Sequence, residues 1–337
     1  MLTSAFDVAY AFALKPGLSL TMSPPVTRAA ALAPGSIGNV GPGLDVLGMA
    51  VTGIGDRVIA ERIDGSGVTI ADAGHTELPV EATANTAGIA ALEVLRRAGS
   101  SIGVRLSIVK GLPLAGGQGG SAASAVAGAV AVNRLLGNPL DATALLECAL
   151  EAEGTVSGLH ADNVAPAMYG GIVLVRSVDP MDVVALPVPA ALRVVLAHPA
   201  QRLETSEARA VLPRYVSREA AISQMANTAA MVAALANGDL ALLGRALDDQ
   251  IAEPARASLL PGFTSAKFAA LNAGALGGSI SGAGPTSFFL TDSDETAVRV
   301  AAALRASYAS RQFPCTVRIE RVALRGALEL GEHATTA

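Results

Sequence analysis

Five glycines lie within residues 111–120, at the start of the stretch 111–136, which reads GLPLAGGQGGSAASAVAGAVAVNRLL. The apolar run at 104–109 predicts a strand before it, and the proline-free run at 121–136, ended by Gly137, predicts a helix. A glycine-rich loop between strand and helix lets backbone N–H groups approach an anion, and the helix N-terminus adds positive partial charge. The pattern is typical either of a phosphate-binding loop or of a turn packed closely on an alanine-rich helix.

Two familiar nucleotide-binding motifs are excluded here. Lys15, Lys110 and Lys267 are not followed by Ser or Thr, so none of them completes a P-loop. No acidic residue closes a following strand at the distance expected for a dinucleotide fingerprint. The glycine-rich stretch therefore needs a second signal from elsewhere in the chain.

A polar loop is predicted earlier in the chain. Residues 33–45 read APGSIGNVGPGLD and carry Ser36, Asn39 and Asp45 among six glycines and prolines. Ordering such a loop costs conformational entropy, which disfavours a loop without a role, although the prolines alone could hold a rigid turn. An amide and a carboxylate on one stiff loop favour a binding function.

A second polar cluster stands just before a predicted strand at 172–176. The sequence there reads SGLHADNVAPAMYGG and contains His160, Asp162 and Asn163. The chain has no G-x-S-x-G elbow, and its other histidines are scattered, so the cluster indicates neither a hydrolase triad nor a histidine metal site.

Two carboxylates end the predicted helix at 141–154, for which Asp141 is the expected N-cap. Glu151 and Glu153 both lie in its last turn. A carboxylate is unfavourable near a helix C-terminus, because the carbonyl end of the helix is negative. One of the two is therefore expected to bind a cation.

The elements that position these residues form two groups. In the first half we expect strands at 47–51, 56–63, 65–72, 104–109 and 172–176, with 65–72 as the hairpin partner of 56–63, and helices at 85–98, 121–136 and 141–154. A proline-rich linker is expected at 179–189. The second half predicts an α+β domain with strands at 192–197, 287–291 and 315–322, helices at 203–212, 217–237, 240–251, 263–273 and 295–308, and a second glycine-rich turn at 277–284. Arg209 and Arg256 stand out there among apolar neighbours.

Composition narrows the class of protein. The 337 residues are 51% hydrophobic and 16% charged, which provides a core and fits two domains of about 150 residues each. A net charge of −5 and the absence of tryptophan argue against a nucleic-acid surface. No long uninterrupted apolar run occurs, so no membrane span is predicted. Cys148 and Cys315 are far apart, which suggests reduced thiols and a cytoplasmic location.

Three separated motifs supply the second signal. They read APGSIGNVGPGLD, PLAGGQGGSAAS and GGSISGAGPTSF. This trio resembles the GHMP kinase superfamily, and the runs HADNVAPAMYGG and LLPGFTSAKFAALNAGALGGSISGAGP most resemble its homoserine kinases. The resemblance covers residues 26–322, nearly the whole chain.

The resemblance implies a two-domain α+β fold, the GHMP kinase fold. A ribosomal protein S5 domain 2-like N-terminal domain would hold ATP at residues 26–186, and a ferredoxin-like C-terminal domain would span 187–328. Residues 1–25 would form a flexible N-terminal extension and residues 329–337 a tail. The family also implies a homodimer with a small-molecule substrate.

ATP and Mg²⁺ are the cofactors that the resemblance implies. Asn85 and Lys110 would lie near the adenine. Ser121 would orient Mg²⁺ with Glu153, for which Glu151 is a rival. The implied ATP-binding residues are Asn85, Lys110, Pro113, Leu114, Ala115, Gly116, Gly117, Gln118, Gly119, Gly120 and Ser121.

The implied substrate is L-homoserine. Asp45 would face its ammonium group by charge matching, and Arg209 and Arg256 would pair with its carboxylate. The implied substrate-binding residues are Asn39, Asp45, His160, Asn163, Thr205, Arg209 and Arg256.

The implied reaction is ATP-dependent phosphorylation of the side-chain hydroxyl to O-phospho-L-homoserine, a step of threonine biosynthesis. Asn163, Ser121 and Glu153 form the implied catalytic set. Asn163 would hold the attacking hydroxyl without deprotonating it, so transfer would be direct and without a strong general base.

One departure from the family pattern leaves alternatives open. Gly120 stands where the family loop usually has a serine, which removes one hydroxyl from the phosphate loop. The alternatives are a GHMP kinase for another small hydroxylated substrate and a ligand sensor without catalysis on the same fold.

Overall fold

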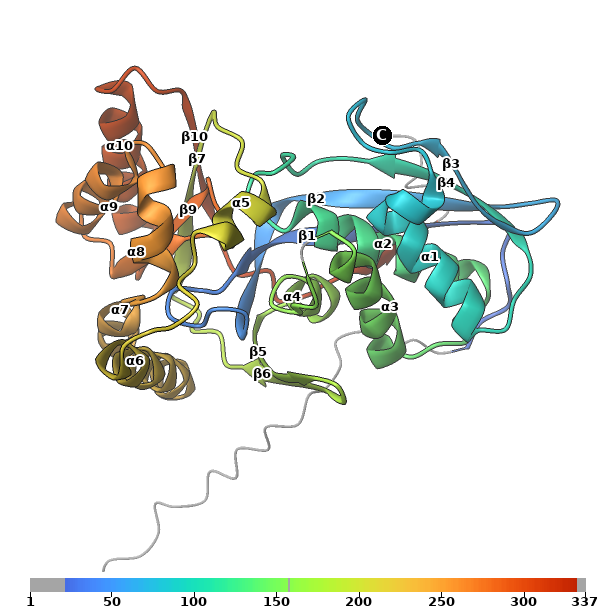
Figure 1. The fold of residues 1–337 in the computed structure, drawn as a ribbon, viewed down its shortest axis with the longest axis horizontal. Coiled ribbons are helices and arrows are strands. Elements are labelled where there is room, and N and C mark those ends of the chain that lie inside the picture. Colours follow the sequence, from blue (N-terminus) through green and yellow to red (C-terminus); the bar gives the residue numbers. More distant parts are fainter. Residues whose placement is uncertain (1–21, 157, 332–337) are drawn as a thin grey trace, which may run out of the picture.

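The computed structural model describes residues 22–156 and 158–331, arranged around two sheets (Figure 1). Most of the expected N-terminal extension, residues 1–21, lies outside the described residues, as do residues 332–337 of the expected tail. Next to the first described residue, the backbone N–H of Ser23 donates to the Gly137 carbonyl at 2.9 Å.

The first sheet is built on a long antiparallel pair. β1 and β2 pair along most of their length, with a bulge between Pro34 and Gly35. β4 pairs antiparallel with the other edge of β2, and β3 joins β4 in parallel. β5 pairs with the start of β2, and β6 pairs with β5. The strands are β1 (Arg28–Gly38), β2 (Leu47–Ile63), β3 (Gly67–Asp72), β4 (Gly103–Val109), β5 (Ile172–Val178) and β6 (Met181–Leu186).

Helix α2 (Gly120–Leu135) lies at the centre of this domain and follows the glycine-rich loop directly. It packs against β1, β2 and the helices α1 (Thr86–Arg97), α3 (Ala142–Gly154) and α4 (Val164–Tyr169). Its alanines and valines are buried on every side, from Ala122 to Leu135. A helix that is apolar all round is a core helix, so its N-terminus has a fixed position.

The second sheet is antiparallel, in the order β10-β7-β9-β8. With the helices between its strands, this order is that of a ferredoxin-like domain, as expected. Its strands are β7 (Arg193–Pro199), β8 (Gly277–Ile280), β9 (Ser287–Thr291) and β10 (Cys315–Glu320). Its helices are α5 (Thr205–Ala210), α6 (Arg218–Asn237), α7 (Leu240–Ala246), α8 (Ala252–Arg256), α9 (Phe263–Asn272) and α10 (Asp294–Ala309). A short 3₁₀ turn, η2 (Ala257–Leu259), follows α8, and another, η1 (Ala82–Ala84), precedes α1 in the first domain.

Alternate residues of the second sheet face two different cores. Val194 and Leu196 pack with α6, α7 and the first domain, including Ile37 and Met49. Val195 and Ala197 face the opposite core beneath α9 and α10. Successive side chains of a strand point to opposite faces, so β7 can pack against a core on each face. The core that contains Val194 and Leu196 also contains residues of the first sheet, and it therefore joins the two sheets.

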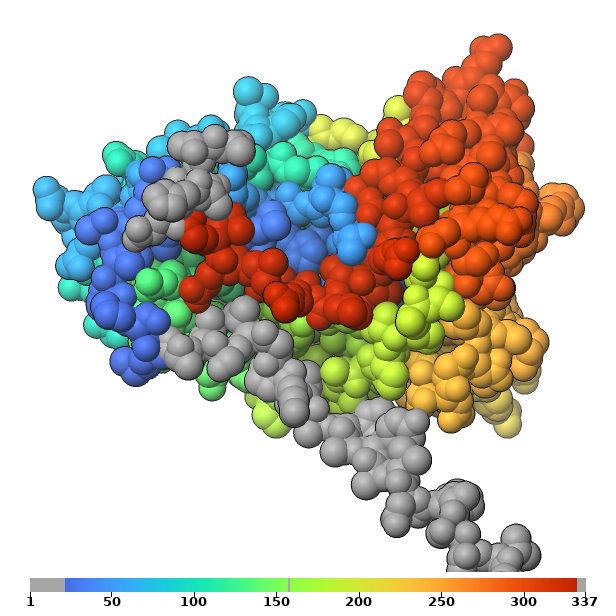
Figure 2. Space-filling view, turned by 180° about the vertical axis from the view of Figure 1, so that it is seen from behind, coloured from blue at the N-terminus to red at the C-terminus, as the bar shows by residue number. Residues whose placement is uncertain are grey.

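The chain returns to the first sheet at its end. β11 (Leu328–Leu330) pairs antiparallel with β1, and Val322 forms a bridge to Val51. Figure 2 shows this last described segment, in red, crossing the blue strands of the first sheet. The sequence predicts a tail from residue 329, but residues 329 and 330 belong to β11. The division at residue 187 stays a prediction.

Strand pairing explains where four of the expected elements differ from the structure. Residues 35–38 belong to β1 and not to a loop, because they pair with 48–51 of β2. β3 is not a hairpin partner of β2, since β1 and β4 occupy both edges of that strand. The expected linker contains β6, which pairs with β5, and the expected glycine-rich turn begins with β8, which pairs with β9.

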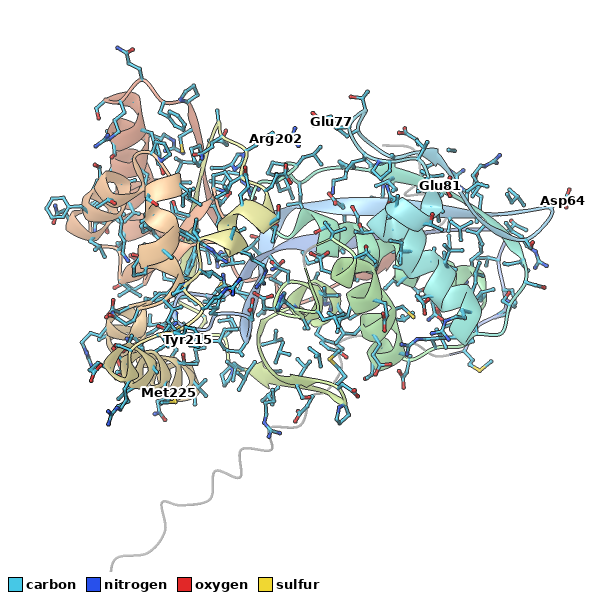
Figure 3. All side chains as sticks on the ribbon, viewed as in Figure 1. Asp64, Glu77, Glu81, Arg202, Tyr215 and Met225 are labelled. Atoms are coloured by element: carbon cyan, nitrogen blue, oxygen red, sulfur yellow. The ribbon has the colours of Figure 1, made fainter. Side chains whose placement is uncertain are left out.

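The expected helix start at Asp141 is confirmed and gives a stability test. The Asp141 side chain accepts a hydrogen bond from the Ala144 amide at 2.8 Å at the N-terminus of α3. Asp141→Ala removes this cap and is expected to lower the free energy of unfolding by about 1 kcal/mol, measured by urea denaturation. Asp64→Ala, at an exposed position (right edge of Figure 3), is the matched control. Equal stability of the two variants would contradict the role of the cap.

Candidate active site

A cavity of about 400 Å³ opens between the two domains and takes residues from both. The expected site residues that line it are Asn39, Asp45, Asn85, Lys110, Pro113, Leu114, Ala115, Gly116, Gly117, Gly119, Gly120, Ser121, Glu153, His160, Asn163, Thr205, Arg209 and Arg256. Glu77 and Arg202 lie at the same cavity, form an ion pair between the domains, and stand side by side in Figure 3.

Gln118 is the expected site residue that does not line the cavity. Its side chain is 3% exposed and points into the domain junction. Its amide nitrogen donates to Thr286 Oγ1 at 3.1 Å, and its amide oxygen accepts from Arg318 at 2.5 Å. The side chain of Gln118 therefore holds the loop to the second domain.

Two hydroxyls of the second domain fix the glycine-rich loop from behind. Thr286 Oγ1 donates to the Gly116 carbonyl at 2.5 Å, and Ser281 Oγ donates to the Gly117 carbonyl at 2.6 Å. The C=O and N–H of one peptide unit point in opposite directions. Because the two carbonyls point toward the second-domain hydroxyls, the N–H groups of the same peptide units point away from these hydroxyls. Sequence analysis missed these two residues, although the third motif contains both.

His198 completes this hydrogen-bond network. Its Nδ1 lies 2.9 Å from Thr286 Oγ1. The proton of that hydroxyl goes to Gly116, so His198 Nδ1 has to be the donor. Burial lowers the pKa of His198, and the positive charge of the nearby Arg318 lowers it further, so the imidazole is held neutral.

The loop requires glycine at 117 and 119, whereas position 120 could accept a side chain. Gly117 and Gly119 have φ of +69° and +67°, a region that side chains disfavour. A Cβ on Gly117 would lie 2.5 Å from the Gly284 carbonyl oxygen. A Cβ on Gly120 would lie 3.5 Å from Lys110 Nζ, an ordinary contact. The space for a serine is therefore present.

Lys110 holds the two ends of the loop together. Its ammonium pairs with Asp56 and donates to the Gly120 carbonyl and to Ser124 Oγ, each at 3.0 Å. Asp56 is fully buried and accepts from the amides of Gly111 and Leu112, both at 3.1 Å. All three protons of the Lys110 ammonium thus have acceptors within the protein, and Lys110 fixes the loop where it lines the cavity.

Ser121 and Glu153 meet at the first turn of α2. Ser121 Oγ donates to Glu153 Oε1 at 2.9 Å, and both line the cavity. Glu151 is exposed and lies away from the cavity. Within residues 22–156 and 158–331, no group of three or more His, Cys, Asp or Glu could hold a metal ion. A hydroxyl and one carboxylate suit Mg²⁺, which takes its other ligands from phosphates and water.

The opposite end of the cavity is charged. Arg209 Nη2 contacts Asp45 Oδ1 at 2.8 Å, and His160 Nδ1 lies 3.4 Å from Asp45 Oδ2. Burial lowers the pKa of His160, against the attraction of Asp45. Arg256 is 2% exposed and donates to the carbonyls of Ala208, at 3.0 Å, and Gly282, at 2.9 Å. Burial and then Arg209 lower its pKa.

The polar turn after β1 is strained and well anchored. Asn39, Val40 and Asp45 all have positive φ, which is costly for a β-branched residue such as Val40. The Asn39 side chain accepts from the Asp45 amide at 3.1 Å and donates to the Gly282 carbonyl at 3.1 Å. Ser36 Oγ donates to Asn163 Oδ1 at 2.9 Å. These bonds fix the side-chain amides of Asn39 and Asn163, and both residues line the cavity.

Asp162 lies in the same cavity and belongs to the polar cluster noted in the sequence, but it was not among the expected site residues. Asp162 is 3% exposed, and its Oδ2 accepts a hydrogen bond from the backbone N–H of Asn39 at 2.9 Å. Burial raises its pKa to about 7, and the negative charge of Asp45 adds to the shift. Only the folded structure reveals this, because the burial depends on contacts distant in sequence.

Comparisons with known proteins agree with this arrangement. Sequence models of the GHMP kinases match at residues 85–171, for the N-terminal domain, and 231–310, for the C-terminal domain. A homoserine kinase of Chlorobium phaeovibrioides is 43% identical over 288 residues, which is 81% of this chain and 89% of the relative. One from Arabidopsis thaliana is 44% identical over 273 residues, 78% of this chain and 74% of the relative.

Solved structures show the same fold. The crystal structure of homoserine kinase from Cytophaga hutchinsonii has a TM-score of 0.88 and 41% identity, and the match covers 92% of this chain and all of the other. A mevalonate kinase of L. major, at 17% identity and a TM-score of 0.67, shares the fold alone. The fold and the glycine-rich loop define a GHMP kinase. Within that class, the chain belongs to the homoserine kinase family. Its described helices include none long and apolar enough to cross a membrane.

Gly120 and Gly117 make a matched pair for testing the phosphate loop. Gly120→Ser is expected to fold normally and to lower the KM for ATP up to about fivefold, since one added hydroxyl contact contributes about 1 kcal/mol. Gly117→Ser places a side chain at positive φ against the Gly284 carbonyl and is expected to raise this KM more than about tenfold. Steady-state kinetics at varied ATP measure both. A Gly117→Ser enzyme with unchanged KM for ATP would contradict this loop geometry.

Proposed function

We propose that this chain transfers the γ-phosphoryl group of ATP to the side-chain hydroxyl of L-homoserine, which yields O-phospho-L-homoserine for threonine biosynthesis. The observation that carries the proposal is a single cavity with two unlike ends. A glycine-rich loop at a helix N-terminus suits phosphates, and a carboxylate with two arginines suits a zwitterion.

The nucleotide binds at the glycine-rich end in this proposal. Loop amides and the N-terminus of α2 receive the phosphates, while Asn85, Pro113 and Leu114 lie where the base would enter. Ser121 and Glu153 hold Mg²⁺, which neutralises phosphate charge when it is bound.

Removal of Mg²⁺ by excess EDTA is expected to abolish turnover, and added Mg²⁺ to restore it.

The amino acid binds at the charged end. Asp45 receives the ammonium group, and Arg209 and Arg256 receive the carboxylate, with Thr205, His160 and Asn39 around them. Asn163 donates from its amide nitrogen to the hydroxyl oxygen, because Ser36 already occupies its amide oxygen. Transfer then depends mainly on alignment and charge neutralisation.

Three further features of the proposal rest on the family resemblance. They are the division into domains at residues 26–186 and 187–328, assembly as a homodimer, and a cytoplasmic location. Light scattering on the purified chain tests the dimer directly, since one or two copies differ twofold in mass.

ADP release from Mg·ATP tests the reaction against a small panel of acceptors. The panel contains L-homoserine, L-threonine, L-serine, shikimate, mevalonate and galactose. Turnover with L-homoserine well above every other acceptor is expected. Preference for shikimate or mevalonate would contradict the proposed substrate and favour a related kinase.

Arg256 gives a sharper test of the amino-acid end. Arg256→Ala is expected to raise the KM for homoserine about 100-fold or more, because truncating one partner of a buried charge pair costs about 2–5 kcal/mol. Arg218→Ala, at an exposed position on α6, is the matched control and should keep the KM of the unmodified enzyme. An unchanged KM for homoserine in Arg256→Ala would remove Arg256 from the substrate site.

A further inference from the structure

We propose that Asp249 and Gln224 are positioning residues for the charged end of the cavity, where they hold Arg256 and the turn that carries Asp45 in a fixed relation to each other. The proposal rests on the proposed function, because it gives both residues a role in binding the same amino acid. Neither residue is among those that line the cavity. Both are buried, with 6% of Asp249 and 7% of Gln224 exposed.

Asp249 holds the start of α8, the helix that ends in Arg256. Its Oδ1 accepts from the backbone N–H groups of Ile251, at 2.9 Å, and Ala252, at 3.0 Å. Its Oδ2 accepts from the backbone N–H of Glu253 at 2.8 Å. α8 has only five residues, too few to be stable through its own hydrogen bonds. Its position therefore depends on contacts such as these, and a shift of its start would move Arg256.

Gln224, on α6, connects Asp249 to the turn after β1. Its Nε2 donates to Asp249 Oδ1 at 3.0 Å and to the Pro42 carbonyl at 2.7 Å. Its Oε1 accepts from the backbone N–H of Gln250 at 2.8 Å, so both N–H groups and the oxygen of this buried amide are used. Pro42 precedes Asp45 by three residues in the same turn. One side chain thus joins the turn with the carboxylate to the segment that positions the arginine.

The turn also packs directly on the chain that leads into α8. A Cβ on Gly41 would lie 2.8 Å from Leu247 Cδ2 and 3.7 Å from Leu247 Cα. Thr228 Oγ1, on α6, lies 3.1 Å from the Pro42 carbonyl, within hydrogen-bond distance. The turn, α6 and the chain before α8 therefore meet in one buried junction.

This junction relates two charges that the amino acid meets together in the proposed function. Asp45 receives its ammonium group and Arg256 its carboxylate, and the two groups are attached to one carbon of the ligand. Hydrogen bonds weaken steeply as their geometry is lost, so a shift of either partner by about 1 Å weakens binding. The separation of the partners is therefore a requirement for affinity.

The glycine-rich loop is fixed by other residues. Its hydrogen bonds come from Lys110, Ser281 and Thr286, and they remain when Asp249 or Gln224 is replaced. A positioning role at the charged end thus predicts a change in the KM for homoserine and little change in the KM for ATP.

Asp249 also acts on Arg256 through its charge. Burial and then Arg209 lower the pKa of Arg256, whereas the negative charges of Asp45 and Asp249 raise it. Asp249 therefore offsets part of the cost of burying a guanidinium ion. Gln224 is neutral, so its replacement tests position without this contribution of charge.

Asp249→Asn in the full chain tests the proposal with a side chain of the same shape. Whichever way the new amide turns, its NH₂ group faces at least one of the N–H donors that Asp249 accepts from. The KM for homoserine is expected to rise about tenfold or more, since hydrogen bonds to a charged group are lost, and the KM for ATP to change less than about twofold. Gln224→Met is expected to change both KM values in the same way.

Asp239→Ala is the matched control. Asp239 is the N-cap of α7 in the same domain, and its side chain accepts from the backbone N–H of Leu242 at 2.9 Å. Loss of this cap is expected to lower the free energy of unfolding and to leave the KM for homoserine unchanged. A purely structural role of Asp249 predicts the same result for Asp249→Asn.

A double-mutant cycle shows whether Asp249 acts through Arg256. In the Arg256→Ala enzyme, Asp249→Asn is expected to lower kcat/KM for homoserine less than about twofold, because the side chain that it positions is gone. A tenfold loss in that background as well would overturn the positioning of Arg256.

The outcomes separate the hypotheses. An unchanged KM for homoserine in Asp249→Asn and Gln224→Met would overturn the proposal, and so would an equal rise in the KM for ATP. If Asp249→Asn does not fold, Gln224→Met decides alone, since it keeps the bonds from Asp249 to the backbone of α8. An unmodified chain that fails to phosphorylate homoserine would overturn the proposed function itself, whereas an active unmodified chain with unaffected variants overturns this role only.

Discussion

The glycine-rich loop depends on one constraint: a buried ion pair fixes its ends while two hydroxyls fix its middle. Lys110 and Asp56 join both ends of the loop from within the first domain. Ser281 and Thr286 hold its carbonyls from the second domain. A loop of small residues has large conformational entropy, so its amides can converge on one anion only if other groups order them beforehand. The second domain therefore contributes to the order of the glycine-rich loop, although the loop belongs to the first domain.

The same constraint couples the two domains. The turn after β8 holds the glycine-rich loop through Ser281, and its Gly282 carbonyl accepts from Asn39 and Arg256 at the charged end. A shift of this turn would move both ends of the cavity together. The core that joins the sheets, and the return of β11 to β1, oppose such a shift. Phosphoryl transfer needs its two substrates in line within fractions of an ångström, and a rigid junction supplies that alignment.

Local signals predicted much of this molecule, and long-range contacts account for the rest. Asn85 and Asp141 mark the starts of α1 and α3 as expected, because a cap depends on neighbours in sequence. The residues that the family motifs marked come together in one cavity, apart from Gln118. Sequence did not predict that residues 35–38 form a strand, because their glycines are typical of a loop and only the pairing with 48–51 makes them extended. Nor did it predict that β3 pairs in parallel with β4, since helix α1 separates the two strands along the chain. Nor could it predict the burial of Asp162, which also depends on tertiary packing.

The charged end of the cavity carries a further argument about the substrate. Asp45 and Arg209 neutralise each other when no ligand separates them. A ligand with only an ammonium group, or only a carboxylate, would take one partner and leave the other charge partly buried and unpaired, which is costly. A zwitterion brings both opposite charges and replaces one ion pair with two. If the amino acid binds at this end, as proposed, the pair favours α-amino acids over simple alcohols or acids of the same size, and it does so by penalising the wrong ligand as much as by attracting the right one.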